Sequence, residues 1–253
     1  MPDGWILAAG CGLVAGAANL AGGFLAVSRR AWDRVHQSYF VAAGAGFMLA
    51  AVILRMVPES YRLATLHGED LLTVGTLVLL GYLLVHFAEH VLVGHFHFGE
   101  ETHHEHWVEP AVGTTALVGL MLHAFFDGVS IGSGFLITPG LGLLVAAAIF
   151  LHKIPEGFTV ASIMAAAGRS RTQAAWSAGL LGATTLVGVL TISAWGSLIR
   201  FALPFSAGAA LYVAASDLIP AVNETKGIRM ALWVFGGVAL FYLTESLLEL
   251  LGL

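Results

Sequence analysis

The chain has 253 residues, of which 58% are apolar and only 11% charged, and its mean hydropathy is +0.85. A soluble domain carries roughly 25% charged residues, so most of this surface must face something other than water. The single cysteine, Cys11, excludes an internal disulfide and a thiolate cluster. The net charge is −5, with the acidic excess in one loop, which argues against nucleic acid as a partner.

The first apolar stretch, residues 5–27, is long enough to cross a bilayer. It lacks the basic beginning of a signal peptide, because Asp3 stands there, and we expect a retained helix. Seven further stretches of similar length follow, at 38–57, 71–93, 112–136, 141–167, 173–198, 201–222 and 229–252. None alternates like the strands of an outer-membrane barrel. The sequence therefore predicts an all-α integral membrane protein with eight transmembrane helices in one domain, residues 1–253.

Basic residues indicate the orientation of the chain in the bilayer. The loops after spans one, three, five and seven lie on one side and together hold Arg29, Arg30, Arg34, Arg169, Arg171, Lys226 and Arg229, although the loop after span three contributes none of them. Because cytoplasmic loops carry the excess of Lys and Arg, we expect both termini outside and the loop 94–111 in the cytoplasm. The membrane expected is the inner, or plasma, membrane of a prokaryote, and a homodimer is a possible assembly.

An internal similarity relates spans two and three to spans seven and eight. The matching segments are Ala45-Gly46-Phe47-Met48-Leu49 before Pro58, and Ala207-Gly208-Ala209-Ala210-Leu211 before Pro220; likewise Gly81 precedes Glu89 as Gly237 precedes Glu245. The copies lie an odd number of spans apart, so they are inverted relative to each other. This predicts a 3+2+3 arrangement, with spans 1–3 and 6–8 around spans 4–5, which is typical of transporters. Chance similarity between apolar segments is the other explanation.

Spans four and five contain the residues that carry chemistry. His123-Ala124-Phe125-Phe126-Asp127-Gly128 and His152-Lys153-Ile154-Pro155-Glu156-Gly157 share the pattern His-x-x-x-carboxylate-Gly. Residues four apart lie on one helical face, so two facing helices would present two imidazoles and two carboxylates to one point. This set suits Zn²⁺, Fe²⁺ or Mn²⁺ and has too much imidazole for Ca²⁺ or Mg²⁺. A charge at mid-bilayer costs roughly 2.5–3.5 kcal/mol, which favours a functional site over a polar cluster that only joins helices.

The motif pair, the eight spans with outside termini and the His-rich loop together resemble the ZIP family of zinc- and iron-regulated transporters. The resemblance covers essentially the whole chain. It implies transport of Zn²⁺, and in some members Fe²⁺, Mn²⁺ or Cd²⁺, toward the cytoplasm, with no enzymatic activity and no cofactor besides the carried ion. In members with a two-metal centre, the ligands of the first metal match His123, Asp127, His152 and Glu156.

The resemblance fails at the second metal of such centres. The family supplies that metal with a polar residue after the first histidine, an acid after the second and a carboxylate from span six. Here Ala124 and Lys153 stand at the first two positions, and span six has no acid. We therefore expect a mononuclear site, with the Lys153 ammonium standing where the charge of the second metal would stand. Met48 in span two matches a methionine that lines the first site, although packing is the commoner role of a methionine.

His86-Phe87-Ala88-Glu89-His90 fits the His-x-x-Glu-His pattern of zinc peptidases. It is the basis of a rival function, an intramembrane metalloprotease, which would need a third zinc ligand and an open water position. We expect instead a polar stripe near the cytoplasmic mouth, where His86, Glu89 and His90 could form a weak exit site for metal.

The loop at 94–111 has no Lys or Arg and contains His95, His97, His103, His104 and His106 among four glutamates. Such a loop can collect transition metal weakly, or it can simply be an acidic solvated loop. A metal sensor without transport would be a third class of function. Finally, Arg55 and Asp217 occupy equivalent positions in the two repeats, so a buried pair between them is expected, unless Arg55 snorkels to the membrane surface.

Overall fold

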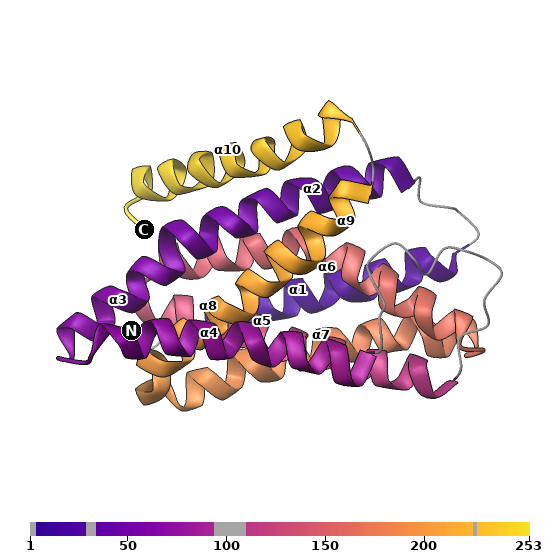
Figure 1. Cartoon of the computed structure of the whole chain (residues 1–253), viewed down its shortest axis with the longest axis horizontal. Helices are drawn as coiled ribbons and strands as arrows, with labels where there is room; N and C mark the ends of the chain where they lie inside the picture. Colours follow the sequence, from indigo (N-terminus) through magenta and orange to yellow (C-terminus); the bar gives the residue numbers. More distant parts are fainter. Residues whose placement is uncertain (1–3, 29–33, 94–109, 225–226) are drawn as a thin grey trace.

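The computed structural model describes residues 4–28, 34–93, 110–224 and 227–253, and every regular element within them is helical (Figure 1). The helices, with short π and 3₁₀ segments labelled η, are α1 (Gly4–Val27), α2 (Arg34–Ala51), η1 (Val52–Met56), α3 (Val57–Leu66), α4 (Leu71–Ala88), η2 (Glu89–Val93), α5 (Pro110–Ile137), α6 (Pro139–Ala166), α7 (Arg171–Ala194), η4 (Gly196–Leu198), α8 (Ile199–Tyr212), η5 (Val213–Leu218), α9 (Ile219–Glu224) and α10 (Ile228–Leu250). Eight continuous helical stretches in the described residues are long and apolar enough to cross a membrane. The predicted fold class is thereby confirmed.

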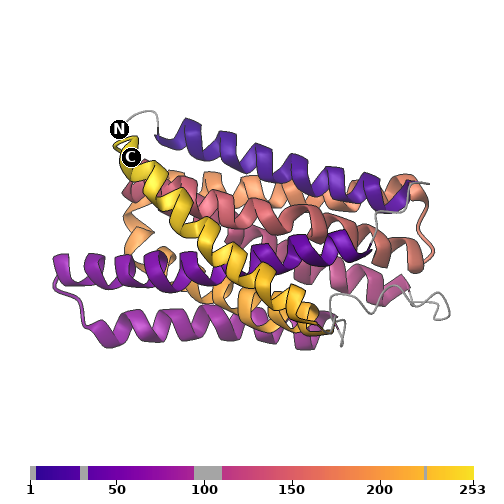
Figure 2. The ribbon, with the colours of Figure 1, turned by 90° about the horizontal axis from the view of Figure 1, so that it is seen from above.

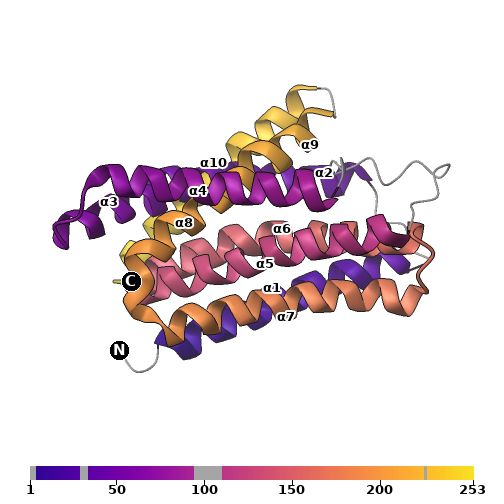
Figure 3. The same ribbon diagram turned by 60° about the horizontal axis from the view of Figure 1, so that its bottom comes forward.

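The helices form two groups, which Figure 3 shows as two layers. Helices α1, α5, α6 and α7 pack against one another in the first group. In the second group α2 packs on α10 and α4 packs on α8, and contacts of α2 with α6 and of α5 with α8 join the groups. The start of α1 and the end of α10 lie at the same end of the molecule (Figure 2), as an even number of crossings requires.

The second and seventh spans are each widened by a π-helical segment just before a proline. In the second, α2 continues through η1 into α3, so the helix runs to Leu66 and not to residue 57, where we expected it to end. Pro58 lies in the first turn of α3, where its missing N–H leaves no α-helical bond unmade, and the wider turn before it makes room for the ring. The seventh span repeats this order with η5 and Pro220. Each proline therefore marks a local widening instead of a helix end.

Glycines set the closest approach of helices in the second group. A Cβ atom on any of four of them would overlap a backbone carbonyl oxygen of the facing helix: Gly46 against Val234, Gly237 against Ala43, Gly208 against Val78, and Gly81 against Phe205. In the internal similarity Gly46 is equivalent to Gly208, and Gly237 is equivalent to Gly81. Span two therefore packs on span eight through the same two glycine positions by which span seven packs on span three, which supports the repeat. The 3+2+3 order stays a prediction.

The expected pair between Arg55 and Asp217 is wrong. The Nε atom of Arg55 lies 2.8 Å from Oε1 of Glu245 on α10, and Asp217 contacts Glu89 at the start of η2. The helix pairing explains the difference. Residues at equivalent positions of spans two and seven face different partners, span eight in one case and span three in the other, so they do not face each other.

Gly237 and Gly236, adjacent on α10, allow a matched test of this packing. A Cβ at Gly237 would overlap the Ala43 carbonyl, whereas a Cβ at Gly236 meets nothing within 4 Å. Gly237→Ala should therefore lower the free energy of unfolding of the purified protein by ~1–3 kcal/mol, the usual cost of overpacking. Gly236→Ala should leave it unchanged or raise it by up to ~1 kcal/mol through helix propensity. Equal thermal stability of the two variants would contradict this account.

Candidate metal centre

Helices α5 and α6 form a tight antiparallel hairpin that brings the two sequence motifs together. Only Thr138 separates them; its side chain accepts a hydrogen bond from the Leu141 N–H at 3.1 Å and caps α6. Pro139 follows in the first turn, where proline fits without loss of a helical bond. Near this turn Gly134 lies against Gly142, so the backbones start out in contact. This short connection places the two motifs on neighbouring, antiparallel helices.

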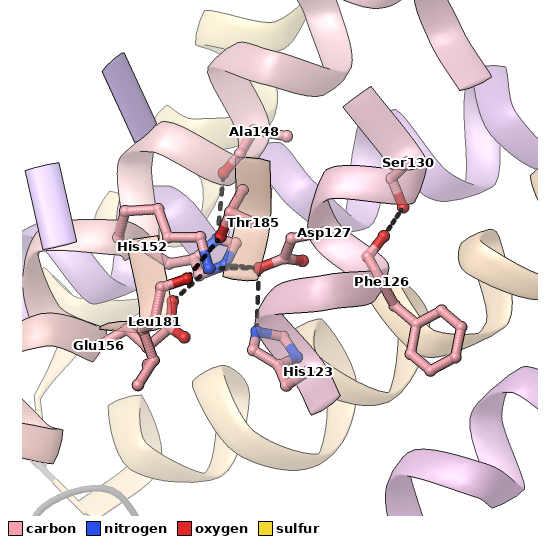
Figure 4. A network of polar contacts seen from close by, with 10 residues as sticks. His123, Phe126, Asp127, Ser130, Ala148, His152, Glu156, Leu181 and Thr185 are labelled. Carbon is pink, nitrogen blue, oxygen red and sulfur yellow. Dashed lines mark hydrogen bonds and ion pairs between the residues drawn. The ribbon is translucent and has the colours of Figure 1, made fainter. Parts of the chain in front are cut away.

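The four residues of the motif pair converge at one buried point (Figure 4). One ligand atom from each of His123, Asp127, His152 and Glu156 can be chosen so that all lie within 4.8 Å of one another. The exposed fraction of these residues is between 1% and 6%. Among the described residues this is the one place where three or more such ligands meet.

Oδ2 of Asp127 is the common atom of this cluster. It lies 3.2 Å from Nε2 of His123 and 3.2 Å from Nε2 of His152. Two ligands of a tetrahedral zinc ion, each bonded at about 2.0–2.1 Å, lie about 3.3 Å apart. Each imidazole nitrogen is therefore about as far from the carboxylate oxygen as two ligands of one shared zinc ion are from each other.

The second nitrogen of His152 supports the same conclusion. Nδ1 lies 3.3 Å from the Ala148 carbonyl oxygen, and a ring that donates this hydrogen bond has its proton on Nδ1. Nε2 of the same ring lies 3.2 Å from Oδ2 of Asp127, so the carbonyl contact fixes the orientation in which Nε2 faces the cluster. Donation from the other ring nitrogen to a backbone carbonyl is also how metal-bound histidines are generally oriented.

Lys153 contributes a positive charge to this cluster. Its Nζ atom lies 2.6 Å from Oδ2 of Asp127 and 2.5 Å from Oε2 of Glu156, and the residue is completely buried. The ammonium thus binds an oxygen of each carboxylate, and in Asp127 it binds the same oxygen that faces both histidines. A cation at this position makes it possible to bury two carboxylates away from water.

Of the positions that would hold a second metal, one is occupied by Lys153 and another by the apolar Ala124. Ala124 is fully buried in a cluster with Val160, Ala161 and Leu181. Helix α7, the sixth span, brings Thr185 near the site, where its hydroxyl donates to the Leu181 carbonyl at 3.3 Å (Figure 4). Met48 is buried in the main apolar cluster, so its suggested role as a ligand stays a prediction.

The residues of the peptidase-like pattern do not assemble a zinc site in the described part of the chain. His86 and His90 are exposed, with ring centroids 4.1 Å apart. Glu89 contacts Asp217 and Tyr212, and the Tyr212 ring lies 5.7 Å from the His86 ring. The five histidines expected to collect metal, His95, His97, His103, His104 and His106, lie outside the described residues.

Two buried polar residues were missed by reasoning from the motifs. Asn19 of α1 and Ser133 of α5 are both 0% exposed, and neither the two amide atoms of Asn19 nor the Ser133 hydroxyl has a hydrogen-bond partner among the described residues. Oε1 of Glu156 has none either. A single amide within an otherwise apolar span was the signal in the sequence that pointed to Asn19.

Comparison with known proteins agrees with this geometry. The chain is 29% identical over 150 residues to zinc transporter SLC39A7 of Rattus norvegicus, covering 53% of this chain and 32% of that one. It is 29% identical over 162 residues to zinc transporter ZIP9-B of Xenopus laevis, covering 59% and 53%. It is also 31% identical over 195 residues to the putative zinc transporter At3g08650 of Arabidopsis thaliana, covering 74% and 30%. The chain thus spans about a third to a half of the length of these relatives.

The sequence model of the family described as ZIP zinc transporter matches residues 109–245. This range includes all four convergent residues and the hairpin that carries them. The family is one of transporters and not of enzymes. Because the match covers more than half of the chain, the protein belongs to the ZIP zinc transporter family.

Proposed function

We propose that this integral membrane protein carries a divalent transition metal ion, Zn²⁺ first among Zn²⁺, Fe²⁺, Mn²⁺ and Cd²⁺, across the membrane toward the cytoplasm. The observation that carries the proposal is the buried convergence of His123, Asp127, His152 and Glu156 on one hairpin. Two imidazoles and two carboxylates form a ligand set for a borderline-soft divalent ion. The names of three relatives, two zinc transporters and one putative zinc transporter, support zinc as the first candidate. The metal is here a substrate and not a resident cofactor.

We further propose that the site holds one ion at a time. With neutral histidines, Asp127, Glu156 and the Lys153 ammonium together carry a charge of −1, and one divalent ion changes this to +1. A second divalent ion would raise the charge to +3 in a dry interior, where uncompensated charge is costly. The apolar surroundings of Ala124 offer that ion no ligand.

Direction and location are part of the proposal. Both termini outside, the plasma membrane of a prokaryote and a homodimer all stay predictions, and the three relatives named above are eukaryotic. The positive-inside rule is the support for the orientation. A whole-chain transport domain agrees with the contacts that join the two helix groups.

The auxiliary metal contact proposed for Glu89 gains support from one feature, while those proposed for His86 and His90 stay predictions. Glu89 and Asp217 occupy the positions equivalent to Glu245 and Arg55, which form an ion pair in the other repeat. Glu89 and Asp217 are both acids, whereas Glu245 pairs with the cation Arg55. A passing metal ion would supply the missing positive charge.

Two other functions fit the observations less well. A metalloprotease would need His86 and His90 to share a metal with a third ligand, and the described residues show no such group. A sensor would need the central site but not the paired glycine contacts of the repeat. Uptake of radioactive zinc into proteoliposomes, with competition by other divalent metals, separates a transporter from both.

Asp127→Ala tests the central site. Loss of the oxygen shared by both histidines should lower zinc uptake by at least tenfold, since even residues that only orient ligands contribute roughly 10–100-fold. Ser130→Ala, one turn along the helix, is the matched control and should transport normally, because its hydroxyl bonds only the Phe126 carbonyl. Near-normal uptake by Asp127→Ala would refute the assignment.

Lys153 tests the number of ions. The purified protein should bind one zinc ion per chain in the central site, measured by calorimetry and elemental analysis. Combining Lys153→Asp with Ala124→Asn should admit a second ion, because it removes the resident cation and adds two oxygen ligands. Two ions in the unmodified centre, both competing with Lys153 for its carboxylates, would contradict the mononuclear proposal.

Deletion of residues 95–106 tests the His-rich loop. If these histidines only gather metal, the deletion should leave the maximal rate of zinc uptake within about twofold and change its dependence on cytoplasmic zinc, since weak surface ligands buffer an ion without carrying it. Protein levels in the membrane provide the control. Complete loss of uptake by a well-expressed deletion variant would show that the loop is part of the path.

A further inference from the structure

Tyr212, the last residue of α8, lies where the second helix group meets the hairpin of the metal centre. It is 4% exposed and forms a small apolar cluster with Val85 and Ala209, and Phe126 of α5 packs against this cluster. Phe126 directly precedes Asp127, and its ring points away from the four converging residues (Figure 4). The Tyr212 ring therefore belongs to the contact between the helix groups beside the centre.

The hydroxyl group of Tyr212 faces the two acids Glu89 and Asp217. Glu89 is the hydrogen-bond partner of the Tyr212 hydroxyl and also of Asp217. The π-helical segment η5 explains this convergence. Residues five apart are hydrogen-bonded in a π-helix, so Asp217 lies about one turn from Tyr212 and on the same side. A phenol beside a carboxylate donates its proton to it, and this hydrogen bond fixes the orientation of the carboxylate.

The other copy of the repeat shows why a donor is useful at this position. Ala50 of span two is equivalent to Tyr212 in the internal similarity. Glu245, which is equivalent to Glu89, pairs with the Arg55 guanidinium at 2.8 Å. The copy whose acid has a cation as its partner thus holds an alanine, and the copy whose acid has another acid beside it holds a tyrosine. The hydroxyl stabilises and orients a carboxylate that no side-chain cation holds in place.

We propose that Tyr212 is a positioning residue for transport, whose hydroxyl holds the Glu89 carboxylate in the orientation in which it contacts the divalent ion. The inference rests on the proposed function, in which Glu89 is an auxiliary metal contact. Hydrogen bonds to metal-binding carboxylates are a general means of orienting such ligands. The packed ring of Tyr212 keeps the hydroxyl in a fixed place relative to α5. An ion that leaves Asp127 then meets a carboxylate that is already oriented.

Tyr212→Phe tests the role of the hydroxyl, because it keeps the ring and its packing. The maximal rate of zinc uptake into proteoliposomes should fall about tenfold, the lower end of the effect of residues that orient metal ligands. Zinc affinity of the central site, measured by calorimetry, should stay within about twofold, since the hydroxyl acts on Glu89. Tyr82→Phe is the matched control and should transport normally. The Tyr82 ring lies 5.0 Å from the Tyr212 ring, but its hydroxyl is hydrogen-bonded to Ser216 at 2.7 Å.

A double-mutant cycle on the same uptake rate separates positioning from packing. Glu89→Gln should lower the rate at least as much as Tyr212→Phe does. Adding Tyr212→Phe to Glu89→Gln should then cost less than about twofold more, since no carboxylate is left to orient. Normal uptake by Tyr212→Phe, or an equal loss with and without Glu89→Gln, would overturn the proposal. Failure of the proposed auxiliary contact looks different, because Glu89→Gln would then itself transport normally.

Discussion

Two carboxylates buried side by side inside a membrane protein must always have a positive charge within reach, and much of this structure follows from that requirement. Asp127 and Glu156 are each almost completely enclosed. Lys153 satisfies them, because its ammonium lies within hydrogen-bond distance of one oxygen of each. Carboxylates alone could not be buried in this way without drawing in water or protons.

The same requirement explains the distribution of small residues around the site. Ionic contacts gain strength when water is excluded, and exclusion depends on close backbones. Gly128 lies against Thr185 and Gly157 against Asn19, so the residues directly after both carboxylates are pressed onto neighbouring helices. The glycine of each motif thus keeps the helices close enough to exclude water. A larger side chain there would separate the helices beside the carboxylates, where water would weaken the ionic contacts most.

Sequence reasoning worked best where chemistry and geometry are both local. The four converging residues could be predicted because each pair lies four positions apart on one helix, and because one short connection places the two helices together. The end of the second span could not, since a proline normally terminates a helix, and only the π turn before Pro58 lets it continue to Leu66. Arg55 and Asp217 were wrongly expected to pair because they occupy equivalent positions in the repeat. Such residues have equivalent partners and do not contact each other: Arg55 pairs with Glu245 of span eight, and Asp217 contacts Glu89 of span three. Asn19 was overlooked because it belongs to no motif, and its burial follows from the packing of α1 on α6.

The one-residue connection between α5 and α6 also constrains how an ion can leave. A site shared between separate domains can release its ligand when the domains part. Here all four converging residues belong to two helices tied at Thr138 and pressed together at Gly134 and Gly142. Pulling these helices apart would break the backbone contact between Gly134 and Gly142, so release by this route would be costly. The short connection therefore keeps the four converging residues together as one rigid unit.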